Sequence, residues 1–418
     1  MKLTANLIGR LVDWKTGRLI NLALAARTYT LNALRSTLTI KHEVIFTMVI
    51  EKKSPDLWLF IVVIILMAIG ICMVFSSSYI MAYKWYGDSY YFLKRQLIYA
   101  IIALVAFIFA IYTDYHYYKK FTLPILILSI AFLSMVYIPS IGRTAGGASR
   151  WVKIGFFSFQ PSEIAKFALI LYMAESLTRK QIKDIKTFIR GVLPPLIIML
   201  VMFLLILNEP DFSTSLIILG ISFIMLFIGG TRVIQLYALI VAAIPLGILI
   251  LSREEYRRTR LLSFLDPWKD PLDSGFHIIQ SLLALGSGGI FGIGLAESKQ
   301  KYFYLPDQHT DFIFSIIGEE LGFIGTVVII ILFTILLWRG FKIALDSSEQ
   351  FGTLLAAGIT SMIVFQSIIN IGVVTKMIPT TGITLPFISY GGTSLIVNMF
   401  CAGILLNISR YKAKEQGA

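Results

Sequence analysis

The sequence of 418 residues contains little charge and very few cysteines and histidines. Only 15% of its residues are Asp, Glu, Lys or Arg, whereas 57% are hydrophobic and the mean hydropathy is +0.79. Soluble domains carry about a quarter charged residues and are about half apolar. The shortage of charge therefore excludes a soluble enzyme, a nucleic-acid-binding module and a disordered protein. We expect the bilayer to be the solvent for most of the chain.

The two cysteines, Cys72 and Cys401, both lie inside apolar runs, so they provide neither a disulfide framework nor a metal-ligand spacing. The histidines, cysteines and carboxylates show no zinc spacing. The sequence also has no phosphate-cradling Gly-Lys-Ser/Thr motif, which argues against ATP-driven transport. No repeat of fixed period and no low-complexity tract is visible, and this favours a single integral domain.

Long apolar stretches are what the sequence does have. A helix needs about 20 apolar residues to cross the hydrocarbon core of a bilayer. The sequence predicts an all-α polytopic membrane protein with about ten transmembrane helices. We expect an integral domain over residues 51–411 and a short tail over 412–418. The predicted spans cover residues 57–79, 96–113, 121–139, 162–178, 188–207, 211–229, 233–251, 312–338, 351–375 and 383–407.

Basic residues in the short loops indicate the orientation of the chain. Loops that carry an excess of Lys and Arg are cytoplasmic as a rule, and the net charge of +13 also fits anionic lipid. The basic loops all fall on one side, which predicts that this side and both termini are cytoplasmic. Lys84, Lys94 and Arg95 lie on the other side and oppose this prediction. The residues in its favour include Lys119, Lys120, Arg179, Lys180, Lys183, Lys186, Arg190, Arg339, Lys342 and Arg410.

Residues 1–50 differ from the rest of the chain because they carry many basic residues against only Asp13 and Glu43. They lack the apolar region and cleavage site of a signal peptide. One interpretation is a basic amphipathic helix on anionic lipid. The others are a disordered tail, or an extension that precedes a start at Met48. We expect a basic extension that is disordered or lies on the membrane surface.

Two segments on the predicted outer side, 141–163 and 252–311, are too long and too polar to be simple connectors. Loops of more than about 12–15 residues are usually functional or disordered. The second segment joins the seventh and eighth predicted helices and contains four arginines between Arg253 and Arg260. Such a cluster can bind a pyrophosphate bidentately, or it can anchor the chain to lipid headgroups. The residues alone slightly favour the anchor.

Charged side chains inside membrane helices are costly, so by default they face a cavity. Glu163 and Lys166 lie three residues apart on one face of the fourth predicted helix. They form either a structural ion pair or a polar wall of a substrate cavity, and both interpretations stay open. Glu319 lies two turns into the eighth predicted helix, beside the face that carries Asp311.

Asp311 follows His309 and Thr310 at the point where the outer loop enters the eighth helix. A carboxylate in this place suits a general base whose pKa is tuned by partial burial. The alternative is a helix N-cap worth about 1 kcal/mol, and the spacing alone favours that cap.

The last outer turn, residues 379–394, contains Ser389 and the pair Gly391-Gly392 together with two prolines. Prolines and paired glycines at the start of an apolar run predict broken or re-entrant backbone. At membrane depth such backbone is tolerated only where protein buries it or where it lines a cavity. Close helix packing through small residues is the alternative.

Seven short motifs, in this order, resemble those of the SEDS family (shape, elongation, division and sporulation) of bacterial cell-wall proteins. The resemblance covers Ser54 to Arg410. Within 281–305 and 383–392 it is closest to the branch that contains FtsW and SpoVE. The motifs are Gly147–Trp151, Gln160–Glu163 with Lys166, Glu209–Asp211, Tyr302–Pro306, His309–Phe314, Glu319–Gly322 and Pro386–Ser394.

The resemblance implies a ten-span peptidoglycan glycosyltransferase that polymerises lipid II at the outer face of the cytoplasmic membrane during division or sporulation. It implies that Asp311 is the catalytic base, which reverses the preference for a cap. The residues that it places at the substrate site are Arg150, Trp151, Glu163, Lys166, His309, Thr310, Glu319, Ser389, Gly391 and Gly392.

The implied substrates are lipid II and a glycan linked to undecaprenyl pyrophosphate. The implied partners are a class B penicillin-binding protein, which is a transpeptidase, and divisome or sporulation proteins, with no nucleic acid. The resemblance leaves open whether a divalent cation, Mg²⁺ or Mn²⁺, assists the reaction.

Two other functions stay open. A lipid II flippase would also bury ionisable residues near broken helices, but a transporter requires charges near the midplane of several spans. Most charges here lie at the outer ends of spans, which favours the enzyme. The other alternative is a non-catalytic scaffold that recruits the transpeptidase.

Overall fold

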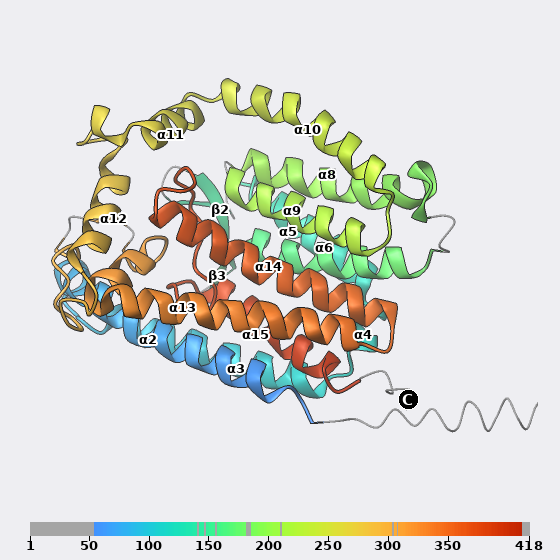
Figure 1. The fold of residues 1–418 in the computed structure, drawn as a ribbon, viewed down its shortest axis with the longest axis horizontal. Helices are drawn as coiled ribbons and strands as arrows, with labels where there is room; N and C mark the ends of the chain where they lie inside the picture. The colour runs from blue at the N-terminus through green and yellow to red at the C-terminus, as the bar shows by residue number, and fades with distance from the viewer. Residues whose placement is uncertain are drawn as a thin grey trace, which may run out of the picture. The chain divides into compact units, whose positions relative to one another are not determined.

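The computed structural model describes residues 54–139, 142–145, 148–154, 157–180, 185–209, 211–302, 305–306 and 308–411. The extension over residues 1–50 and the tail over 412–418 lie outside the described residues, so their predicted character stays a prediction. The described residues are mostly helical and belong to one structural unit (Figure 1).

Each of the ten predicted spans coincides with a helix, so the predicted all-α polytopic fold is confirmed. Six helical segments of the described chain are long and apolar enough to cross a membrane. The remaining helices are shorter, such as α5 with 14 residues, or carry charges, as α6 does. The ten helices are α2 (Leu57–Tyr86), α3 (Tyr91–Tyr112), α5 (Thr122–Met135), α6 (Pro161–Thr178), α8 (Leu193–Asn208), α9 (Phe212–Ile228), α10 (Val233–Arg253), α13 (Ile313–Asp346), α14 (Gln350–Val374) and α15 (Gly392–Ile408).

Both long polar segments contain regular structure that the hydropathy pattern did not define. The first forms a three-stranded antiparallel sheet of β1 (Gly142–Ala145), β2 (Ala148–Ile154) and β3 (Phe157–Phe159), in the order β1-β2-β3. The second contains α11 (Glu255–Leu265), the 3₁₀ turn η2 (Pro267–Lys269) and α12 (Phe276–Ser287). Two short elements complete the list, namely α4 (Tyr115–Lys120) and the π-helical turn η1 (Phe188–Val192), which leads into α8.

Helices α14 and α15 form the buried centre of the bundle. In α14, 78% of the most apolar stretch is buried, whereas in α10 the share is 6%. Glycines allow the neighbouring helices to come close. A Cβ on Gly358 of α14 would lie 2.7 Å from Cγ2 of Ile170 in α6, and one on Gly403 of α15 would lie 2.5 Å from the carbonyl oxygen of Phe107 in α3. Helix α10 therefore lies at the edge of the bundle (Figure 1), where its apolar side chains face outward.

The last span begins later than predicted. Its helix starts at Gly392, and residues 379–391 form no helix. This segment is the broken backbone that the prolines and paired glycines predicted. It passes beside the start of α13, where the chain forms a polar cavity.

Helix α13 is broken at Gly322, whose φ of 68° and ψ of −164° are not helical. The segment 289–294 fills the break. The amide nitrogens of Phe323 and Ile324 donate to the carbonyls of Gly289 and Ile290 at 2.9 and 3.2 Å. A Cβ on Gly322 would lie 2.3 Å from the amide nitrogen of Gly292, so only glycine fits. We call this arrangement the α13 clasp, and it fixes the first turns of α13.

Candidate active site

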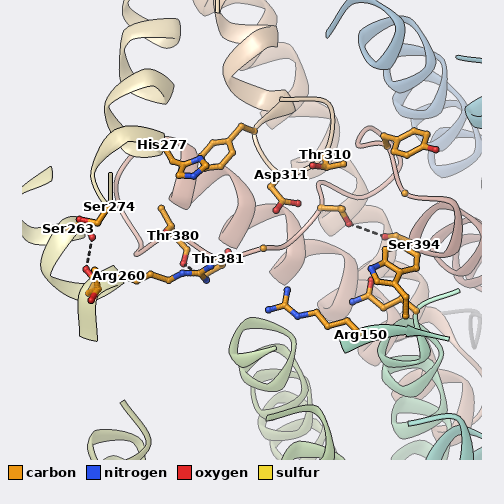
Figure 2. Close-up of a pocket in the computed structure, with 18 of the residues that line it drawn as sticks. Arg150, Arg260, Ser263, Ser274, His277, Thr310, Asp311, Thr380, Thr381 and Ser394 are labelled. Atoms are coloured by element: carbon orange, nitrogen blue, oxygen red, sulfur yellow. Dashed lines mark hydrogen bonds between the residues drawn. The ribbon is translucent and has the colours of Figure 1, made fainter. Parts of the chain in front are cut away.

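A cavity of about 510 Å³ lies at the end of the bundle where α6, α13 and α15 begin (Figure 2). Its lining comes from three parts of the chain. The β2 strand, the N-cap of α6 and the start of α15 contribute Arg150, Trp151, Gln160, Tyr390, Gly391 and Ser394. Helices α11 and α12 and the residues between them contribute Thr259, Arg260, Ser263, Asp273, Ser274 and His277. Between these two ends lie Thr310, Asp311, Phe312 and the 380–384 segment.

The carboxylate of Asp311 and the guanidinium of Arg150 approach the same point. A Cβ built on Gly382 would lie 3.6 Å from Oδ2 of Asp311 and 3.4 Å from Nη1 of Arg150. Figure 2 shows both side chains directed into the cavity from opposite sides. Because Gly382 has no side chain, the place where its Cβ would lie stays open, and both groups border it. A substrate group placed there would meet both charges.

Asp311 does not cap α13. The helix begins at Ile313, and Phe312 holds the cap position without a side-chain cap hydrogen bond. The interpretation of Asp311 as an N-cap is therefore wrong. Its side chain lines the cavity instead.

Hydrogen bonds hold three successive carbonyl groups at Asp311 and just before it. The amide of Tyr390 donates to the carbonyl of His309 at 2.9 Å, and the hydroxyl of Ser389 donates to that of Thr310 at 2.6 Å. Nδ2 of Asn370 donates to the carbonyls of both Asp311 and Ile383 at 2.7 Å. The backbone of Asp311 is thereby tied to α14 and to the segment that carries Gly382. Its position in the cavity is preorganised.

Arg150 is supported by the turn between α8 and α9. Its Nε donates to the carbonyl of Glu209 at 3.4 Å. The Glu209 side chain is buried, and both of its carboxyl oxygens lack a hydrogen-bond partner within the described residues. Burial, with a smaller contribution from Asp211, raises the pKa of Glu209 to about 9. Glu209 is therefore protonated at neutral pH and is not an anionic partner of Arg150.

Glu163 and Lys166 form a buried ion pair with a distance of 2.7 Å, and neither residue is part of the cavity lining. Both side chains are less than 10% exposed. The structure thus places the pair inside the bundle, where each charge compensates the other.

Four other predicted site residues also lie outside the lining and contact other parts of the bundle, namely Glu319, Ser389, Gly392 and His309. Glu319 accepts hydrogen bonds from the amides of Lys299 and Gln300 at 3.0 and 3.4 Å and from the hydroxyl of Ser298. Ser389 is buried under Thr310. A Cβ on Gly392 would lie 2.6 Å from the ring of Tyr99.

The ring of His309 packs between Phe92 and Tyr390, with centroid distances of 4.5 and 5.4 Å. Burial lowers the pKa of His309 to about 4, so the imidazole is neutral at physiological pH. Of the predicted site residues, the structure brings Arg150, Trp151, Thr310, Asp311 and Gly391 together around the cavity.

Comparison with known proteins identifies the family. The model of the FtsW/RodA/SpoVE family, described as "Cell cycle protein", matches residues 56–414. The chain belongs to this family.

Among its relatives, "Stage V sporulation protein E" of Bacillus subtilis is 45% identical over 87% of this chain and 99% of the relative. A protein of Geobacter metallireducens called "Probable peptidoglycan glycosyltransferase FtsW" is 46% identical over 86% of this chain and 96% of the relative. These relatives confirm the family inferred from the motifs and the expectation of an enzyme of the glycosyltransferase class.

Solved structures of the family have the same fold. Rod shape determining protein RodA of Thermus thermophilus matches with a TM-score of 0.63 and 26% identity, over 86% of this chain and 98% of the other. A chain from the work "Structural coordination of polymerization and crosslinking by a peptidoglycan synthase complex" matches with a TM-score of 0.70 and 30% identity, over 86% and 99%.

Several lining residues of this FtsW/RodA/SpoVE family member were not selected from the sequence. Asp273, Ser274 and His277 belong to the long polar loop, which sequence alone could not fold back over α13. Asn370 does not line the cavity but holds the carbonyl of Asp311, and it had a detectable signal in the sequence, since it is a polar residue within an apolar span. The ring of His277 stacks on Phe312 with a centroid distance of 5.8 Å, which gives the cavity one apolar wall.

The described residues contain no group of three or more His, Cys, Asp and Glu side chains that could hold a metal ion. The acidic and imidazole groups that line the cavity are Asp273, His277 and Asp311. A divalent cation at this site would therefore need ligands from the substrate, as Mg²⁺ often takes from phosphates.

Proposed function

We propose that this protein is a peptidoglycan glycosyltransferase that polymerises lipid II, with Asp311 as the general base. The observation that carries the proposal is the open space at Gly382, which both the Asp311 carboxylate and the Arg150 guanidinium approach. The activity named for its FtsW relatives supports the same chemistry. Lipid II and a growing glycan linked to undecaprenyl pyrophosphate are the proposed substrates.

The reaction needs a base because a sugar hydroxyl is a poor nucleophile. Asp311 accepts the proton of the 4-hydroxyl on the terminal GlcNAc of the incoming lipid II. The oxygen attacks the anomeric carbon of the growing chain, a new C–O bond forms with inversion, and the bond to the pyrophosphate breaks. Undecaprenyl pyrophosphate leaves with the electron pair. A positioned base contributes about 10²–10⁴-fold to such a step.

Arg150 supplies the complementary charge. The leaving pyrophosphate gains negative charge as its bond to the sugar breaks, and a guanidinium can bind two of its oxygens at once. Behind Arg150, the raised pKa of Glu209 keeps that carboxyl group neutral, so Glu209 does not compete with the pyrophosphate for the guanidinium. Any divalent cation carried by the pyrophosphate would add to the same stabilisation.

The site's position supports an enzyme at the membrane surface. The cavity lies at the ends of helices rather than at their middles, where a lipid-linked sugar would be presented. Its volume falls within the range of about 300–1,000 Å³ that is common for ligand sites. The protein is a multi-pass membrane protein, and we place the cavity on the outer face of the cytoplasmic membrane with both termini in the cytoplasm.

We also propose a class B penicillin-binding protein as partner, together with proteins of division or sporulation. The relatives are named for division and for sporulation, and one structural relative comes from work on a peptidoglycan synthase complex. A glycan polymerase that works beside a transpeptidase supplies strands where they are crosslinked.

The test is glycan polymerisation from lipid II by the purified full chain with its transpeptidase partner. Asp311→Asn keeps the size of the side chain but removes the base, and we expect at least a hundredfold loss of polymer. The matched control is Asp88→Asn, because Asp88 is a surface carboxylate that pairs with Lys94. Polymer formation at the normal rate by a well-folded Asp311→Asn variant would refute the assignment.

A further inference from the structure

The cavity contains a second guanidinium that the proposed chemistry does not use. Arg260 of α11 lines the cavity, and its Nη1 donates to the carbonyl of Thr380 at 3.5 Å. Figure 2 shows Arg260 at one end, with Thr380 and Thr381 between it and Asp311. Arg150, in contrast, approaches the same point as Asp311. The cavity therefore has one cation beside the base and another at a distance from it.

The two substrates carry their pyrophosphates at different distances from the reacting atoms. In the growing chain, the pyrophosphate is bonded directly to the carbon that is attacked. In the incoming lipid II, the reacting hydroxyl lies on the outer sugar, so a whole disaccharide separates it from the pyrophosphate. A base next to the reacting atoms thus has the donor's pyrophosphate beside it and the acceptor's pyrophosphate one disaccharide away.

We propose that Arg260 forms the acceptor subsite, which binds the pyrophosphate of the incoming lipid II, while Arg150 binds that of the growing chain. The inference rests on the proposed function. It assigns the α11–α12 end of the cavity to the acceptor and the end at β2 and α15 to the donor.

The character of α11 supports a lipid-linked ligand at this end. The helix presents Arg260 to the cavity, while Leu262 and Leu265 are 56% and 67% exposed. A helix with a basic face and exposed leucines is typical of the membrane interface, with the leucines in the lipid. The helix follows α10, whose apolar side chains face outward at the edge of the bundle. A ligand with an anionic head and a polyprenyl tail fits this arrangement, because the head can bind Arg260 and the tail can lie beside the exposed leucines.

One acidic residue, Asp273, also lines this end. A carboxylate would repel a bare pyrophosphate, but it would bind a divalent cation that the pyrophosphate carries. Asp273 would help to hold such a cation, and most of the other ligands would have to come from phosphate and water.

The test measures polymerisation rates against lipid II concentration for the full chain in complex with its transpeptidase partner. A lipid-linked glycan is supplied as donor at saturating concentration, so the KM for lipid II reports on the acceptor. We expect Arg260→Gln to raise this KM about tenfold and to leave kcat within about twofold. Arg150→Gln should lower kcat instead. The matched control is Arg258→Gln, since Arg258 is an exposed residue of the same helix that does not line the cavity.

Three results would overturn the inference. They are an unchanged KM in Arg260→Gln, a fall in kcat alone, and an equal effect of Arg258→Gln, which would indicate general attraction to the headgroups. A supplied lipid-linked glycan gives a further check, because its apparent KM as donor should stay the same in Arg260→Gln. Failure of the proposed function is recognised separately, as absence of polymer from the unaltered protein or full activity of Asp311→Asn.

Discussion

At the residue level, the reactivity proposed for Asp311 depends on groups that never touch substrate. Asn370 is 1% exposed, and its amide holds the carbonyls of Asp311 and Ile383 together. These bonds fix the carboxylate relative to Gly382 and hence to Arg150. A buried amide that bridges two segments fixes their relative positions but adds little net stability, because the same groups bind water in the unfolded chain.

Replacing Asn370 with leucine should therefore affect catalysis more than binding. We expect Asn370→Leu to lower kcat for polymerisation by about tenfold to a hundredfold, with little change in the KM for lipid II, because a shift of about 1 Å is enough. Steady-state kinetics of the purified complex measure this.

Asn407→Leu is the control for the loss of a buried amide. Asn407 has the same burial, and it bridges the amide of Tyr115 and the carbonyl of Ile111 at the other end of the bundle. This variant should lose stability but keep its kcat. Equal losses of kcat in the two variants would show that Asn370 has only a structural role.

At the level of elements, the α13 clasp connects the long polar loop to the helix that follows Asp311. Glu320 accepts a hydrogen bond from Ser76 of α2 at 2.7 Å and pairs with the buried Lys301 at 3.4 Å. Glu319 binds the neighbouring part of the same loop. The two carboxylates thereby hold residues 296–301 between α2 and α13. This explains why ionisable residues occur two turns inside a membrane helix.

The break at Gly322 gives a direct test of the clasp. Gly322→Ala places a methyl group against the backbone of Gly292 and Ile290 at a positive φ, and it should destabilise the protein by about 2–5 kcal/mol. Polymerisation should fall with it, because the first turns of α13 would shift. Thermal unfolding in detergent and polymerisation assays measure the two effects.

Gly286→Ala serves as the comparison, since a Cβ there would meet no atom within 4 Å. It should leave activity unchanged and should not lower stability, because alanine favours a helix more than glycine does. If Gly322→Ala is equally silent, the clasp does not constrain α13.

At the level of the whole molecule, the two ends of the bundle differ in charge and in function. The end opposite the cavity carries basic residues at the end of α4 and between α6 and α8, among them Lys119, Lys120, Arg179 and Lys186. The cavity end carries the sheet, α11 and α12. Since basic loops usually stay in the cytoplasm, this asymmetry supports the proposal that the cavity faces outward.

Two exposed leucines at opposite ends make the orientation testable. Leu272 lies beside the cavity and is 88% exposed, while Leu345 lies in the last turn of α13 and is 82% exposed. In a chain without its two native cysteines, Leu272→Cys should react with a membrane-impermeant maleimide on intact cells. Leu345→Cys should react only after permeabilisation. The reverse pattern would contradict the proposed orientation.

The sequence by itself was enough to predict that most of this chain lies in a lipid bilayer. It was also enough to predict the ten helices, the family and the residue proposed as the base. Hydropathy and short motifs are local properties, so they can be read without a fold. It also predicted the broken backbone before α15 from prolines and glycines. Hydropathy did not predict the three-stranded sheet, because the sheet forms from a polar segment. It also did not predict the break at Gly322, because that break depends on hydrogen bonds to the distant segment 289–294.

Only the tertiary structure decided which polar residues share the cavity. Three predicted site residues bind other protein groups inside the bundle instead. Glu163 pairs with Lys166, and Glu319 accepts a hydrogen bond from the amide of Lys299. Arg260, His277 and Asn370 join the site because the long loop and α14 bring them to Asp311. Motifs reveal which side chains are unusual in a membrane, but whether such a side chain meets a partner or an open space depends on packing between segments far apart in the chain.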